Sequence, residues 1–189
     1  MLNVQLKKMN GIWVGDTSFS TLYVNEKMIH LCEEMGIDIV NPEKLESYFF
    51  LEYLSNGLQV MDNCNNALTY RSTANYFGKF YGVASLDEWS NNRVYFNRHV
   101  SLKSNMINAI SFAHALSALL YENAYNKAQV VIHYQDVTSG VLDMDAEALP
   151  EQDVSVTFFE SDNELSYNAD SIVDFDSSEA VCVFAIHKL

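Results

Sequence analysis

The last third of the chain contains three short runs rich in β-branched and aromatic residues, and they constrain the fold more than any other feature. The runs are QVVIHY at 129–134, VSVTFF at 154–159 and AVCVFAI at 180–186. Such residues favour strands because their side chains pack well on a pleated surface. Acidic connections that contain Gly140 and Pro150 separate the runs. The three runs therefore predict neighbouring strands of a largely antiparallel sheet.

Helices are expected upstream of these strands. Residues 104–125 are so rich in apolar side chains that they predict the central helix. Periodicity and end signals predict three more helices at 18–35, 42–56 and 66–81, with short strands at 37–40 and 94–96. The N-terminal run NVQLKKMNGIWVGD predicts a β-hairpin that turns at Asn10-Gly11, a pair favoured in type I′ turns.

The order of hairpin, helices and strands predicts an α+β fold with a mostly antiparallel C-terminal sheet. The 189 residues, of which 49% are hydrophobic, suffice for one sizeable core. We therefore expect residues 1–189 to form a single domain, with a helical middle at about 18–126 and an acidic, strand-rich segment at 128–187. Because strands and helices do not alternate, a doubly wound nucleotide-binding fold is not expected.

The cysteines and the hydropathy pattern indicate a cytoplasmic protein without membrane contact. Cys32, Cys64 and Cys182 are odd in number and widely spaced, which predicts reduced, buried thiols instead of a disulfide framework or a zinc site. Gly11 and Gly15 interrupt the first residues, so no secretory signal is expected. No apolar run reaches the length of about 20 residues that a membrane span needs.

The net charge of −14 is concentrated in one segment. Residues 128–187 contain 13 of the 25 acidic residues and no Lys or Arg, whereas the rest of the chain has 12 acids and 11 bases. Clustered like charges repel each other and disfavour folding unless something offsets them. The segregation therefore suggests a use for the acids, although charged sheet edges and loops that only keep a protein soluble would look similar.

Two Asp-x-Asp pairs in this segment raise the alternative of a metal-dependent enzyme. VLDMDAE and IVDFDSSE place Asp143 with Asp145 and Asp174 with Asp176 after apolar residues. Carboxylates at a strand end can hold Mg²⁺ or Mn²⁺. The first pair resembles the Asp-x-Asp motif of haloacid-dehalogenase-type phosphotransferases and of many glycosyltransferases. That resemblance implies phosphotransfer or glycosyl transfer, but it covers only a few residues.

Other catalytic and binding motifs are weak. No closely spaced glycines predict a phosphate loop, and His114, His133 and His187 are expected to be hydrogen-bonded core residues. The basic island NNRVYFNRHVSLK superficially suits single-stranded nucleic acid. Because 13 unbalanced acids on the same domain repel phosphates, we expect no direct nucleic-acid contact, and the island's bases are predicted to pair with part of the acidic segment. No cofactor is indicated.

The leading hypothesis is a non-enzymatic binding protein whose acidic surface engages a basic partner. Alternate residues of a strand share one face about 6.6 to 6.8 Å apart, so acids at i and i+2 form a row of charge that partly imitates a nucleic-acid strand. Such a surface suits inhibition of a nuclease or another nucleic-acid enzyme, as an immunity protein or a phage anti-defence protein does. The residues predicted to contact the partner are Asp143, Asp145, Glu147, Glu151, Asp153, Glu160, Asp162, Glu164, Asp170, Asp174, Asp176 and Glu179.

A third hypothesis is a structural or oligomerising module. In this alternative AVCVFAI pairs with its copy across a free sheet edge and forms a homo-oligomer.

Overall fold

The computed structural model describes residues 5–42, 49–54, 57–62, 67–72, 93–96, 101–122, 127–136, 152–160, 172 and 179–186. For 49–54, 57–62, 67–72, 93–95, 136, 152, 153 and 160, the description covers the backbone. The elements are β1 (Lys7–Met9), β2 (Ile12–Asp16), β3 (Ser20–Val24), α1 (Glu26–Met35), β4 (Phe49–Leu54), β5 (Gly57–Asp62), β6 (Ala67–Ser72), β7 (Arg93–Tyr95), α4 (Leu102–Glu122), β8 (Ala128–Asp136), β9 (Gln152–Glu160) and β10 (Glu179–Ile186).

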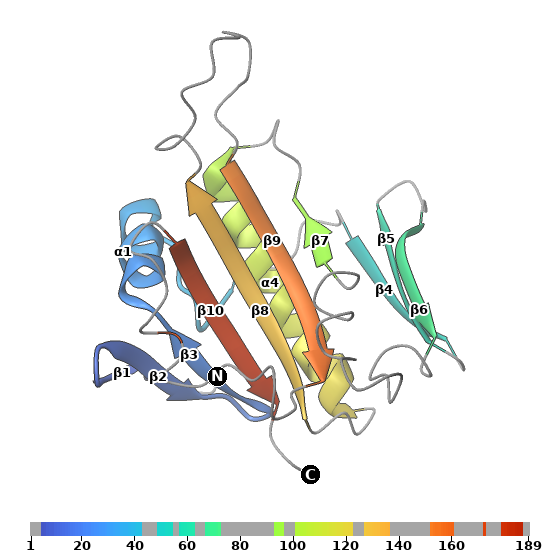
Figure 1. The fold of residues 1–189 in the computed structure, drawn as a ribbon, viewed down its shortest axis with the longest axis horizontal. Helices are drawn as coiled ribbons and strands as arrows, with labels where there is room; N and C mark the ends of the chain where they lie inside the picture. Colours follow the sequence, from blue (N-terminus) through green and yellow to red (C-terminus); the bar gives the residue numbers. More distant parts are fainter. Residues whose placement is uncertain are drawn as a thin grey trace, which may run out of the picture.

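Seven of these strands form one antiparallel sheet in the order β1-β2-β3-β10-β8-β9-β7 (Figure 1). The three predicted C-terminal strands are β8, β9 and β10, and the predicted short strand at 94–96 is β7. The last strand, β10, lies between β3 and β8 and so joins the N-terminal hairpin to the C-terminal strands. The α+β class with an antiparallel sheet, an N-terminal hairpin and a central helix is confirmed.

The N-terminal hairpin turns where the sequence predicts. Asn10 has φ of 48° and Gly11 has φ of 88°. Positive φ at both central residues is the type I′ geometry, whose twist matches the twist of the flanking strands. Met9 pairs with Ile12 across the turn.

Both helices pack on one face of the seven-stranded sheet. In Figure 1, α4 runs behind β8 and β9, and α1 lies beside β10. The core on this face includes Phe112 and Leu116 of α4, Met28 of α1, and Phe158 and Phe184 of the sheet, all fully buried. Alternate strand residues point to the same face, so the even-numbered residues of β8, β9 and β10 supply this core.

The first helix begins later than the predicted start at Ser18 or Ser20. Residues 20–24 form β3 instead, in which Ser20, Leu22 and Val24 are buried and the two intervening residues are half-buried. This alternation has the period of a strand, and it outweighs the helical pattern that follows it. Asn25 then caps α1, and Gly36 ends it with a φ of 66°, as its position after the apolar pattern predicts. Residues 37–40 form no strand.

The predicted helices at 42–56 and 66–81 are wrong over 49–54 and 67–72. These residues form β4 and β6 of an antiparallel sheet in the order β4-β5-β6. The aromatic run FFLEYL has high strand propensity. Gly57, a plausible helix end in the sequence, is instead the first residue of β5 and pairs with Leu54 of β4. Residues 73–81 lie outside the described residues.

The position of β10 removes one of the three hypotheses in its stated form. All residues from Cys182 to Ile186 pair with β3, and those from Glu179 to Ala185 pair with β8. Because neighbours occupy both sides of β10, AVCVFAI has no free edge at which to pair with its copy. Association of two copies through another surface stays a prediction. Within the described part of the chain, no helix is both long and apolar enough to span a membrane.

His114 of α4 couples the stability of this core to pH. Its Nε2–H donates to the carbonyl oxygen of Ile39 at 2.9 Å, and its ring lies edge-on to Phe184 with centroids 4.8 Å apart. The pKa of His114 is lowered because burial disfavours the charged ring, which outweighs the opposing effects of the Ile39 carbonyl and the Asp38 carboxylate.

We therefore expect His114 to make the protein less stable as pH falls. The unfolded chain protonates this histidine near its ordinary pKa of about 6.5, whereas the folded chain does so only at lower pH. Between the two values the unfolded state binds more protons, so the free energy of unfolding decreases as pH drops below about 6.5. Urea unfolding measured from pH 8 to pH 5 should show that the free energy of unfolding depends less steeply on pH in His114→Gln than in wild type. His30→Gln, which replaces an exposed histidine, is the control. Equal slopes in wild type and His114→Gln contradict this role.

Candidate partner-binding site

The structure places three of the twelve predicted partner-contact residues. Glu179 begins β10, while Asp153 and Glu160 lie near the two ends of β9. The other nine lie outside the described residues: Asp143, Asp145, Glu147, Glu151, Asp162, Glu164, Asp170, Asp174 and Asp176. The described strands nevertheless fix where the acidic connections leave and rejoin the sheet.

Three acid-bearing strand ends meet at one end of the sheet. Asp136 ends β8 and pairs with Gln152, and the neighbouring Gln135 pairs with Asp153 on one side and with Glu179 on the other. Adjacent strands are about 4.8 Å apart, so Asp153 and Glu179 are about 10 Å apart across β8. We call the strand ends bearing Asp136, Asp153 and Glu179 the acidic end of the sheet.

Chain connectivity brings more acids to the acidic end. The connection at 137–151 leaves from Asp136 and returns at Gln152, and its residues include Asp143, Asp145, Glu147 and Glu151. The connection at 161–178 returns there as well, at Glu179, three residues after Asp176. In the sequence, Glu151 directly precedes Gln152.

Glu160 is at the opposite end of the sheet. It pairs with Ala128 at the start of β8, eight residues along β9 from Gln152. That length is about 27 Å at the rise of an antiparallel strand. Asp162 and Glu164 follow Glu160 in the sequence. The described acids of the segment thus lie at two different ends of the sheet, which the linear sequence does not distinguish.

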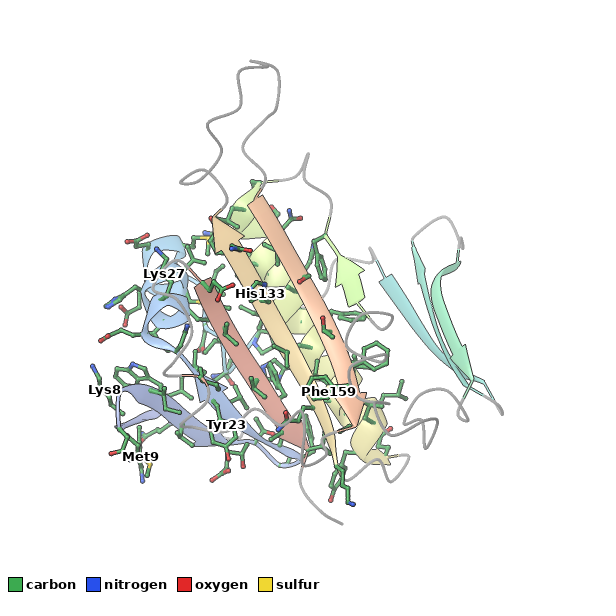
Figure 2. The ribbon with its side chains drawn as sticks, viewed as in Figure 1. Lys8, Met9, Tyr23, Lys27, His133 and Phe159 are labelled. Atoms are coloured by element: carbon green, nitrogen blue, oxygen red, sulfur yellow. The ribbon has the colours of Figure 1, made fainter. Side chains whose placement is uncertain are left out.

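His133 and Glu179 form a partly buried pair beside the acidic end. The distance between His133 Nε2 and Glu179 Oε1 is 3.1 Å, and the exposed fractions of the two side chains are 12% and 21%. Figure 2 shows His133 toward the end of β8 that lies next to the start of β10. The carboxylate comes from β10, 46 residues from His133 in the sequence. His114 and His133 are hydrogen-bonded as predicted, and His187 lies outside the described residues.

Asn25 connects this site to the first helix. Its Oδ1 accepts from the backbone N–H groups of Met28 and Val181, both at 3.0 Å, and its Nδ2 donates to the carbonyl oxygen of Glu179 at 2.8 Å. The Asn25 N–H donates to the carbonyl oxygen of Val181 at 3.1 Å. One side chain therefore caps α1 and also fixes the first residues of β10, where the acidic connection ends.

The second face of the sheet anchors the other acidic connection. Ile172 is fully buried in a cluster that contains Ile12, Val131, Phe159, Val181 and Val183. It is the only residue of 161–178 that the structure describes, and Asp170 and Asp174 lie two residues to either side of it. The apolar pair Ile172-Val173 inside an acidic run is the signal that could have predicted this anchor.

The described cysteines are unsuited to nucleophilic chemistry. Burial raises the pKa of Cys32 to about 12 and that of Cys182 well above its ordinary value. A thiolate is the reactive form, and neither thiol forms it at neutral pH. Both are free and buried, as predicted. Cys64 lies outside the described residues.

No three His, Cys, Asp or Glu side chains come together as metal ligands among the described residues. Both Asp-x-Asp pairs lie outside those residues, so the metal-dependent alternative stays a prediction.

Comparisons of the chain with models of protein families, with curated proteins and with solved structures found no match.

Proposed function

We propose that this protein is a non-enzymatic, cytoplasmic binding protein that inhibits a basic partner, such as a nuclease or another enzyme that handles nucleic acid. The observation that carries the proposal is the meeting of three acid-bearing strand ends at the acidic end of the sheet. A partner with a basic groove would meet Asp153 and Glu179 together with the acids of the adjoining connections.

Two features of the described residues support this use of the acidic end. The strands that form it, β8, β9 and β10, each have a neighbouring strand on both sides, so its acidic residues belong to strands that are hydrogen-bonded along both edges. Rigid charges bind with less loss of conformational entropy than charges on mobile chains. In addition, the stretch from Ala128 to His187 offers no Lys or Arg that could neutralise them locally.

Two described lysines of the N-terminal region lie on different elements. Figure 2 shows Lys8 on the N-terminal hairpin and Lys27 on α1. Lys8 Nζ is 2.9 Å from Glu26 Oε1, an exposed pair within the N-terminal half of the chain. Lys27 follows Asn25 by two residues and so lies near Glu179, to which Asn25 is hydrogen-bonded. The excess of acids at the acidic end would steer a basic partner, with an effect that weakens as salt screens it.

Capture of a basic partner tests this proposal. Tagged protein should retain one or more basic, nucleic-acid-handling proteins from lysate at about 50 mM salt and less of them at about 300 mM. The Asp143→Asn, Asp145→Asn, Glu151→Gln, Asp153→Asn variant should lose that material, and the purified partner's enzymatic activity should fall when wild type is added.

The matched control neutralises four acids that precede the acidic segment 128–187, Asp62→Asn, Asp87→Asn, Glu88→Gln and Glu122→Gln, and so changes the net charge equally. It should capture the same proteins as wild type. The proposal is abandoned if nothing basic is retained at low salt, or if both variants lose the material equally.

A further inference from the structure

A hollow of about 380 Å³ lies at the C-terminal end of α1. It is a wide, open depression of the surface and not an enclosed pocket. The wall is formed by the last turns of α1, the segment 36–40 and a residue preceding β1. Its apolar lining consists of Leu6, Ile29, Cys32, Ile37, Ile39 and Val40.

The rim of this hollow is acidic. Glu33 and Asp38 line it, Glu34 adjoins Glu33 in the sequence, and the last turn of α1 has no basic residue. The C-terminal end of a helix carries a partial negative charge, so carboxylates there are unfavourable and cations are favourable. Glu33 and Asp38 thus place two carboxylates beside the apolar lining, with His30 Nδ1 3.6 Å from Glu33 Oε2 and Lys7 next to Leu6 in the sequence.

Asp38 is held in place at the rim. Its Oδ1 accepts from the backbone N–H groups of Val40 at 2.9 Å and Asn41 at 3.1 Å, and its Oδ2 accepts from Asn41 Nδ2 at 3.2 Å. Burial raises the pKa of Asp38, but these hydrogen bonds outweigh it and leave the pKa below its ordinary value. The carboxylate is thus ionised at neutral pH, with a defined position beside the apolar lining.

We propose that the hollow is a docking site for a segment of the basic partner that inserts an aliphatic or aromatic side chain flanked by Lys or Arg. The inference rests on the proposed function and extends it to a second contact region. Charge complementarity favours this occupant, because a second copy of the chain carries a net charge of −14 and would add repulsion.

The two regions are close enough for one partner. Helix α1 starts beside Glu179, to which Asn25 is hydrogen-bonded, and the hollow lies at its other end. Ten helical residues span about 15 Å. An interface of ordinary size buries about 800 Å² on each partner, so it can include both the hollow and the acidic end.

A labelled peptide tests the inference directly. The probe is a nine-residue peptide with a central Leu-Phe pair flanked by lysines, and its control carries Gly-Ser in place of that pair. In methyl NMR spectra of the full chain, the probe should shift the signals of Ile37 and Val40. Glu33→Lys should weaken its binding about three- to tenfold, while Glu122→Lys, an equal charge change two turns of α4 beyond His114, should not.

Three results overturn the inference: no binding of the probe, equal binding of the Gly-Ser control, or shifts confined to residues outside the hollow. Ile37→Ser provides a second test, because it removes apolar lining without altering charge. It should weaken binding of the probe and leave binding of the control peptide unchanged. The proposed function is judged separately, by capture with the acidic-end variant. If that variant loses partner capture and the probe peptide does not bind, the proposed function is retained and only the docking site is rejected.

Discussion

Replacing Asn25 by alanine is expected to lower the free energy of unfolding by about 2–4 kcal/mol. Asn25 is buried, and its side chain satisfies the N–H groups of Met28 and Val181 and the carbonyl group of Glu179. Alanine removes the helix cap and leaves these backbone groups without their partner. Loss of a cap alone costs about 1 kcal/mol, and each unsatisfied buried group adds about 1–3 kcal/mol before relaxation.

Urea unfolding followed by circular dichroism measures this effect. Asn25→Asp is the matched control, because it keeps the acceptor for both N–H groups and loses the donor to the Glu179 carbonyl. Its destabilisation should be smaller than that of Asn25→Ala. If Asn25→Ala unfolds at the same urea concentration as wild type, Asn25 does not connect α1 to β10 as described.

Truncating Ile172 to alanine should have an effect of similar size, about 2–4 kcal/mol. Ile172 is fully buried against Val181, Val183 and Phe159, so truncation leaves a cavity on the second face of the sheet. Ile172→Val removes one methylene group and should cost only about 1 kcal/mol. The urea midpoint should be highest for wild type, lower for Ile172→Val and lowest for Ile172→Ala. An Ile172→Ala variant as stable as wild type contradicts the anchoring role.

The anchor also links stability to the proposed function. Asp170 and Asp174 flank Ile172, so its release should make that part of the acidic connection less ordered and weaken partner binding at unchanged net charge. Phe159→Leu retains an apolar side chain in the same cluster and provides a milder perturbation. If the partner binds Ile172→Ala as tightly as wild type, we would infer that it contacts the acidic end alone and not the residues around Ile172.

Local signals determined how much of the fold was predictable. Asn10-Gly11 specifies its hairpin because both residues accept positive φ, and the apolar density of α4 and the β-branched runs of β8, β9 and β10 specify their elements. The errors arose where one signal has two meanings. A glycine such as Gly57 can follow a helix or begin a strand, and the strand period of Ser20–Val24 runs directly into the helical pattern of α1, so the boundary between the two elements was not specified.

The candidate site was less predictable than the fold. The sequence revealed the acidic segment but not its division into two groups, because that division depends on strand direction and register. The pairing of Gln135 with Asp153 and Glu179 brings two acids together that are 26 residues apart, whereas Glu160 lies at the other end of β9. The pair of His133 with Glu179 likewise depends on β10 lying next to β8.

The association rate of the captured partner, measured by stopped flow at two salt concentrations, tests the central claim most directly. With Asp143, Asp145, Glu151 and Asp153 neutralised, the rate at about 50 mM salt should fall about tenfold or more, and its dependence on salt should become shallower. The control with Asp62, Asp87, Glu88 and Glu122 neutralised should associate nearly as fast as wild type. Equal rates and equal salt dependence in wild type and the acidic-end variant would contradict the claim that the acidic end engages the partner.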